Sequence, residues 1–85
     1  MTWHVDLSRR TQRMLDRASP RDRRRLLAAI RKLAEDPFAG DILKLYGVAD
    51  AWRLRVGPWR IFMKIDQSER KVGVEDIVRR TSTTC

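Results

Sequence analysis

The residues most capable of chemistry are basic side chains in the stretch AWRLRVGPWRIFMK. Arg53 and Arg55 alternate with apolar residues before a Gly-Pro pair, and Arg60 and Lys64 do the same after it. A charged edge that discourages unwanted strand pairing is the commoner explanation for any single arginine. It explains less well three arginines within eight positions of a chain that is already positive. A guanidinium fork matches two phosphate oxygens, so several forks on a rigid backbone suit a polyanion.

The elements that must position these side chains follow from the alternation itself. Period-two patterns on both sides of a Gly-Pro turn predict a β-hairpin with strands at residues 52–56 and 59–66. Successive side chains of a strand point to opposite faces, so Arg53 and Arg55 share one face of the first strand. Arg60 and Lys64 share one face of the second strand for the same reason. The predicted hairpin is therefore also a basic surface.

Two amphipathic helices are predicted before the hairpin. The first runs from about Ser8 to Ala18, and the second begins at Ser19-Pro20 and stops at Asp36-Pro37. Such a helix needs a polar side, so its basic residues are interpreted as a solvated face rather than as phosphate contacts. These residues of the second helix are Arg21, Arg23, Arg24, Arg25, Arg31 and Lys32.

The order of the elements predicts the fold class. A short strand at residues 3–5 precedes the helices, and strands at 42–46 and 72–78 flank the hairpin. Strands grouped after helices indicate an α+β domain, here the single domain 1–85. We expect a twisted, antiparallel, four-stranded C-terminal sheet that packs one face on the helical hairpin and leaves the other face open.

Composition narrows the classes of function. Nineteen Lys and Arg against eleven Asp and Glu give the 85 residues a net charge of +8, which suits nucleic acid, an anionic membrane or an acidic protein. Cys85 is the only cysteine and His4 the only histidine, so neither a thiolate metal site nor a triad is predicted. No apolar stretch approaches the roughly 18 residues of a membrane span. We therefore expect a soluble, cytoplasmic protein that needs no metal or cofactor and does not enter a membrane.

Two strings carry a family resemblance. LKLYG, then after a short gap WRLRVGPWRIFMKID, resembles the motif of the RelE/ParE superfamily of toxins from bacterial toxin-antitoxin systems. In that family a leucine-rich strand ends in glycine, a W-R-x-R-x-G turn follows, and the next strand opens with an aromatic residue and Arg. The resemblance covers nearly the whole chain. It implies a RelE-like fold, a cognate antitoxin as partner and a toxin–antitoxin hetero-oligomer.

Resemblance to the RelE branch further implies a ribosome-dependent endoribonuclease that cleaves mRNA and inhibits translation. Such an enzyme activates a ribose 2′-hydroxyl against the adjacent phosphate, and preorganised cations stabilise the negative charge that gathers on the phosphoryl oxygens. By motif position, the implied phosphate clamps are Arg60 and Arg80. The other implied RNA-binding residues are Arg53, Arg55, Arg79 and Lys64.

The general base stays open between two residues. Arginine does not readily give up a proton, so it is a poor base. Lys44 occupies the basic place in the family's LKLxG string, but it would need its pKa lowered by surrounding cations. Asp41 stands just before that string, where some relatives carry a carboxylate, and it would need only proximity.

The chain also departs from the family pattern. Many RelE-type toxins carry a functional tyrosine beyond the last basic residue, where this chain has Cys85 in the tail TSTTC. After Trp59 it has Phe62-Met63 in place of the family's frequent tyrosine. Three hypotheses therefore remain: a RelE-like nuclease, a ParE-like inhibitor of DNA gyrase without nuclease activity, and a catalytically disabled module that binds RNA or its antitoxin.

Overall fold

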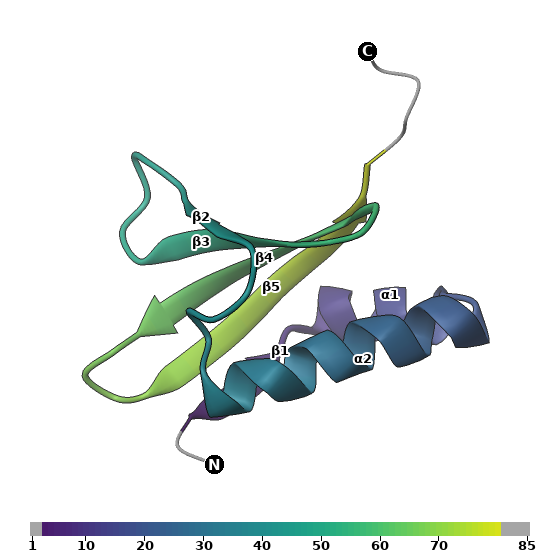
Figure 1. Ribbon diagram of the computed structural model, residues 1–85, viewed down its shortest axis with the longest axis horizontal. Helices are drawn as coiled ribbons and strands as arrows, with labels where there is room; N and C mark the ends of the chain where they lie inside the picture. Colours follow the sequence, from purple (N-terminus) through teal and green to yellow (C-terminus); the bar gives the residue numbers. More distant parts are fainter. Residues whose placement is uncertain (1–2, 81–85) are drawn as a thin grey trace.

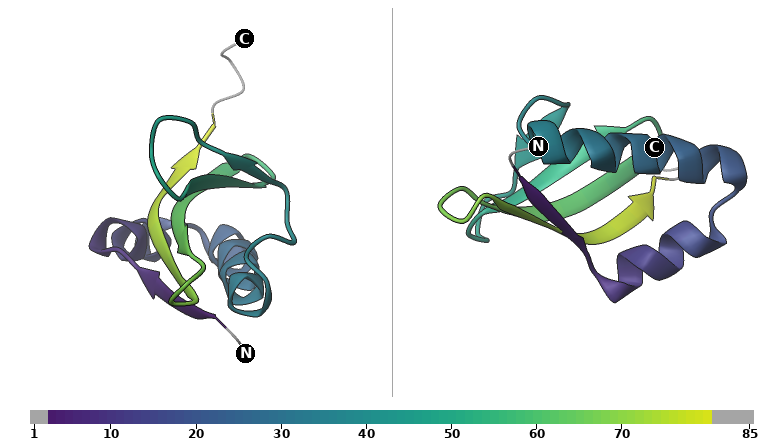
Figure 2. Two further views of the ribbon diagram at one scale, coloured as in Figure 1. Left: turned by 90° about the vertical axis from the view of Figure 1, so that its left-hand side faces the viewer. Right: turned by 90° about the horizontal axis from the view of Figure 1, so that it is seen from below.

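Two helices lie on one face of a five-stranded sheet in the computed structural model, which describes residues 3–80 (Figure 1). Viewed from the helix side, the helices form a V in front of the strands (Figure 2). This architecture confirms the predicted α+β class. The elements are β1 (His4–Leu7), α1 (Arg9–Arg17), α2 (Pro20–Glu35), β2 (Ile42–Lys44), β3 (Ala51–Val56), β4 (Trp59–Asp66) and β5 (Lys71–Arg79).

The strand order is β1-β5-β4-β3-β2. The four C-terminal strands pair antiparallel, as predicted. The first strand adds a fifth member, because β1 pairs in parallel with β5 through partners such as Val5 and Val72. A parallel pair needs a long crossover, and the whole chain between β1 and β5 supplies it. The strand predicted at residues 42–46 is shorter than expected, because β2 ends at Lys44. The chain then turns through Gly47 (φ 87°) and Asp50 (φ 60°).

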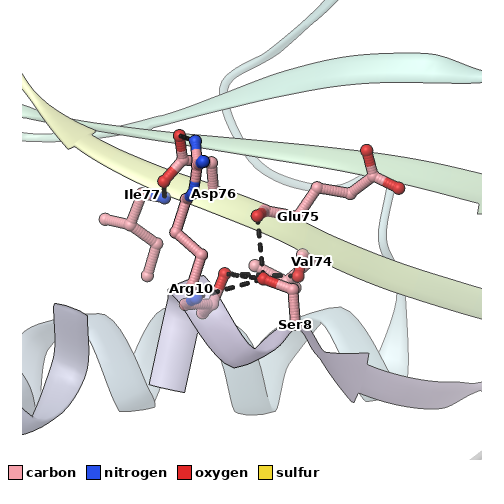
Figure 3. Close-up of polar contacts among 7 residues, drawn as sticks. Ser8, Arg10, Val74, Glu75, Asp76 and Ile77 are labelled. Atoms are coloured by element: carbon pink, nitrogen blue, oxygen red, sulfur yellow. Dashed lines mark hydrogen bonds and ion pairs between the residues drawn. The ribbon is translucent and has the colours of Figure 1, made fainter. Parts of the chain in front are cut away.

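Ser8 fixes the start of α1 against β5. Its Oγ accepts a hydrogen bond from the amide of Thr11 at 3.1 Å and donates to the carbonyl of Glu75 at 2.8 Å (Figure 3). Thr11 is fully buried, and its hydroxyl donates to the carbonyl of Val74 at 3.2 Å. Both carbonyls lie where the β4–β5 register shifts, since Met63 pairs with Val74 and Phe62 with Asp76. The Ser8 and Thr11 hydroxyls thus donate hydrogen bonds to carbonyls at the irregular part of the β4–β5 pairing.

The helical hairpin is held by its caps and by one arginine. Ser19 accepts from the amide of Asp22 at 3.2 Å, as the predicted N-cap of α2 should. Arg23 donates to three carbonyls at the end of α1, those of Leu15 at 2.9 Å, Asp16 at 3.0 Å and Ala18 at 2.9 Å. The interpretation of Arg23 as part of a solvated face is therefore wrong. The last carbonyls of a helix have no hydrogen-bond donor within that helix. The Arg23 guanidinium, which comes from α2, donates to these carbonyls of α1.

We expect Arg23→Ala to lower the free energy of unfolding by about 1–3 kcal/mol, because partly buried carbonyls lose a charged donor. Chemical denaturation measures the change. Arg24→Ala is the matched control, since the neighbouring Arg24 is exposed. Equal losses from the two substitutions would show that the charge of α2 matters rather than the contacts of Arg23.

The core lies between the helices and the inner face of β3, β4 and β5. Leu26 from α2 and Ile61 and Val72 from the sheet are fully buried. At one end, Phe38 makes edge-to-face contacts with Trp3 and Trp52, at ring-centroid distances of 6.0 and 5.5 Å. None of the helices within residues 3–80 is long and apolar enough to cross a membrane.

Candidate nucleic-acid interface

The register of the predicted hairpin brings its arginines to one face. Arg55 pairs with Arg60, and Arg53 pairs with Phe62. Cross-strand partners have Cβ atoms about 5 Å apart on the same side of a sheet. Leu54, between the two β3 arginines, points into the core on the opposite side. We call the side away from the helices the open face; its residues in β3, β4 and β5 are Arg53, Arg55, Arg60, Phe62, Lys64, Asp76 and Val78.

Arg60 is the centre of this face. Partial burial, followed by the charges of Arg80, Arg53 and Arg55, lowers the pKa of Arg60, whereas Asp41 raises it. Its Nη1 donates to the carbonyls of Gly57 and Trp59, at 3.1 Å each. These bonds hold the guanidinium over the β3–β4 turn. The site thus contains a fixed cation surrounded by like charges, which an anion would stabilise.

The end of β5 brings Arg80 to the same place. Its amide donates to the carbonyl of Pro58 at 2.7 Å, and the last residues of β5 run beside the β3–β4 turn (Figure 1). Arg79 lies on the other side of the sheet, with its guanidinium carbon 5.6 Å from the ring centroid of Trp59. The structure therefore joins Arg80 to the arginines of the open face and places Arg79 against a core aromatic ring.

Asp41 lies next to the open face and is already paired. Its Oδ2 lies 2.6 Å from both Nε and Nη2 of Arg55, and its carbonyl accepts from the amide of Arg55 at 2.9 Å. Both side chains are more than half exposed, so the pair adds little to stability. It sets the direction of the Arg55 guanidinium and keeps a carboxylate within electrostatic reach of Arg60.

Lys44 and Lys64 are not brought to Arg60. Lys44 pairs with Trp52, and its Nζ lies 5.5 Å from the centroid of that ring, on the side of the sheet opposite Arg53. Lys64 is on the open face but stands four residues from Arg60 along β4, a separation of about 13 Å. Of the two candidate bases, only Asp41 is therefore near the arginines.

A groove adjoins the open face at the edge of β3. Its volume is about 540 Å³, and it lies between α2, the chain after α2 and β3. Apolar side chains such as Leu33 and Leu54 line it together with the cations Arg25, Lys32 and Arg55. The Arg25 guanidinium is so near the turn that a Cβ on Gly57, which has φ 57°, would collide with it. Sequence reasoning missed this position of Arg25, because nothing local to α2 indicates contact with the hairpin.

Phe62 was also not predicted as a site residue. The alternation already placed it in phase with Arg60 and Lys64, so the signal was present in the strand pattern. Among residues 3–80, no group of three or more His, Cys, Asp or Glu side chains is arranged to hold a metal ion.

One family model matches most of the chain, and several solved structures share its fold. Residues 5–82 match the model of the ParE toxin of type II toxin-antitoxin systems, parDE. No curated protein matches the sequence significantly. The fold is similar to that of the archaeal RelE–RelB complex from Pyrococcus horikoshii OT3, with a TM-score of 0.85 and 22% identity over 98% of this chain and 100% of that one. It is also similar to the toxin-antitoxin complex RelBE2 from Mycobacterium tuberculosis, with a TM-score of 0.81 and 20% identity over 94% and 100% of the two chains. For the isolated E. coli RelE toxin, the TM-score is 0.80 at 15% identity over 96% and 88%.

Proposed function

The chain belongs to the family of ParE toxins of type II toxin-antitoxin systems, within the RelE/ParE superfamily, and from this premise we propose that it is a RelE-like endoribonuclease acting on mRNA in the ribosome. The observation that carries the proposal is the position of Arg60, held in place among Arg53, Arg55 and Arg80 on the open face. Arg60 is within electrostatic reach of three other guanidinium groups, and such an arrangement suits a phosphate that gains negative charge during reaction.

In the proposed reaction the ribose 2′ oxygen bonds to the adjacent phosphorus as the bond from phosphorus to the 5′ oxygen breaks. A base removes the proton of the 2′-hydroxyl, and the departing 5′ oxygen takes up a proton from water. Arg60 and Arg80 stabilise the phosphoryl oxygens, and Arg53 and Arg55 orient the strand. Arg53 is half-buried and its Nε has no hydrogen-bond partner within residues 3–80, so a nearby anion would also offset part of its desolvation.

We expect Asp41→Asn to slow single-turnover cleavage roughly 10²-fold and to flatten the acidic limb of the pH–rate profile, if Asp41 is the base. Lys44→Met should leave the rate nearly unchanged, because Lys44 lies on the other side of the sheet. The pH profile is the decisive readout, since Asp41→Asn also disturbs Arg55. A large loss from Lys44→Met with a normal profile for Asp41→Asn would assign the base to Lys44.

A cognate antitoxin is the partner that the family implies, and two of the similar structures are toxin complexes with RelB-type antitoxins. The +8 charge favours an acidic or amphipathic segment of that antitoxin, lying over the open face or along the helical hairpin in a hetero-oligomer. The groove between α2 and β3 joins these two surfaces. Association that did not weaken with ionic strength would contradict the electrostatic part of this pairing. If an acidic protein is encoded next to this chain's gene, its failure to rescue growth on co-expression would contradict the pairing itself.

A ParE-like action on DNA gyrase is the second candidate, and one observation favours it. Of the two candidate bases, Asp41 is already paired with Arg55, and Lys44 lies on the far side of the sheet, so neither is both unpaired and beside Arg60. Inhibition of gyrase requires no base.

One comparison separates the two candidates. Cleavage sites are mapped on translated messages, and gyrase supercoiling is assayed with the same preparation. Cleavage without an effect on gyrase supports the nuclease. Gyrase inhibition by a protein that leaves translated messages intact would overturn it.

A further inference from the structure

Phe62 is an aromatic side chain that lies on the open face, outside the hydrophobic core. It is half-buried on the open face, in the middle of the sheet. Unlike Trp52 and Phe38, it is not among the partly buried apolar side chains that pack against the core. Two other apolar residues of this face, Leu43 and Val78, are 51% and 45% exposed. The flat ring of Phe62 therefore contributes little to the fold from this side.

Charged groups of opposite sign flank the ring. Arg53 pairs with Phe62 from β3, and Asp76 pairs with it from β5. The Arg10 side chain extends from α1 to the open-face side of β5, where its Nη1 lies 3.4 Å from Oδ2 of Asp76, and Oδ1 of Asp76 accepts from the amide of Ile77 at 2.9 Å (Figure 3). Arg10 reduces the repulsion between this carboxylate and a bound polyanion. A carboxylate has about four lone-pair positions, so Asp76 retains capacity to accept from a ligand.

The spacing along β4 suits one nucleotide. Phe62 follows Arg60 by two residues on the same face, a separation of about 6.8 Å. A phosphate held at Arg60 would therefore leave its base within reach of the Phe62 ring. Proteins read unpaired RNA by stacking bases on aromatic side chains and by hydrogen bonds to the exposed base edges.

Building on the proposed function, we propose that Phe62 is the stacking platform for one base of the RNA strand, and that Asp76 favours a base carrying an exocyclic amino group there. The ring of the base lies on Phe62, its phosphate lies toward Arg60, and the amino group donates to the Asp76 carboxylate. Cytosine and adenine supply such a donor at the edge where uracil presents a carbonyl. Phe62 is thus a binding residue, and Asp76 a specificity residue.

The stacking part is tested with the full chain and short single-stranded RNAs that carry 2-aminopurine, whose fluorescence is quenched by stacking. We expect the parent protein to quench one labelled position. Phe62→Leu should weaken binding roughly tenfold and lose the quench, whereas Phe62→Tyr should retain both. Leu43→Ala is the matched control, since it removes an exposed apolar side chain from the same face. An RNA that is abasic at the quenched position should bind the parent and Phe62→Leu equally, which loss of folding cannot produce.

The specificity part compares cytosine with uracil at that position. We expect the parent to bind the cytosine RNA about fivefold or more tightly, and Asp76→Asn to reduce this preference. Equal binding of the two RNAs by the parent would overturn the role of Asp76.

The outcomes separate this inference from the proposed function. A parent that cleaves messages on ribosomes while Phe62→Leu keeps full affinity and quench would overturn the Phe62 subsite alone. A parent that neither cleaves messages nor binds any RNA would overturn the nuclease and the subsite together. Weakened association with the antitoxin in Phe62→Leu, at unchanged RNA affinity, would make the open face a protein interface and overturn the inference.

Discussion

Arg60→Ala should slow single-turnover cleavage on programmed ribosomes by about 10²-fold or more, the scale of losing one preorganised donor in the transition state. The reason is that Arg60 is the guanidinium held by the turn carbonyls of Gly57 and Trp59 and surrounded by the other arginines of the open face. Arg60→Lys should restore only part of the rate, because it keeps the charge but loses the planar fork. Arg80→Ala should show a comparable loss.

Controls for this prediction come from α2. Arg24→Ala and Arg31→Ala each remove one exposed positive charge outside the open face, so the rate should change little. The folded fraction of every variant is measured in parallel, since Arg60 also bonds to the turn. Equal losses in α2 and on the open face would indicate diffuse electrostatic binding instead of a phosphate clamp.

Ile61→Ala should lower the free energy of unfolding by about 2–5 kcal/mol, because Ile61 is fully buried at the centre of the sheet and its removal leaves a cavity. A domain of this length has a total stability of roughly 4–13 kcal/mol. The substitution therefore removes a large share of it. Urea denaturation followed by tryptophan fluorescence measures the change.

Leu43→Ala provides the comparison for that experiment. Leu43 is 51% exposed on the open face, so truncating it should cost within about 0.5 kcal/mol. A small effect of Ile61→Ala, or a similar effect of Leu43→Ala, would contradict the placement of the core between the helices and the inner face of the sheet.

The local elements were predictable from sequence because their signals are local. Ser19-Pro20 marks the start of α2, and the structure shows the Ser19 cap and Pro20 in the first turn. The alternation around the Gly-Pro pair predicted β3 and β4, and in β4 every second residue from Trp59 to Ile65 is buried accordingly. The alternation also predicted that Arg53 and Arg55 share one face, because every second side chain of a strand points to the same side. The family could also be recognised, since its motif consists of these same strands.

Relations between strands and helices depended on contacts that no local pattern contains. Lys44 and Arg79 were grouped with the site by motif position, but strand pairing places them against the rings of Trp52 and Trp59 on the other side of the sheet. Arg23 was predicted to be part of a solvated face, but the packing of α2 against α1 brings its guanidinium to the carbonyls at the end of α1.

The sequence by itself thus determined the type and order of the elements and which hairpin residues share a face, because these follow from periodicity and capping within a few residues. Only the tertiary structure decided which arginines meet. Arg80 reaches Arg60 because its amide bonds to Pro58 in the β3–β4 turn, and Asp41 reaches Arg55 because the chain before β2 pairs with β3. Phe62 lies between Arg53 and Asp76 because a register shift in β4 and β5 sets their pairing. Such alignments join residues far apart in the chain, and they are set by the packing of the whole sheet on its helices.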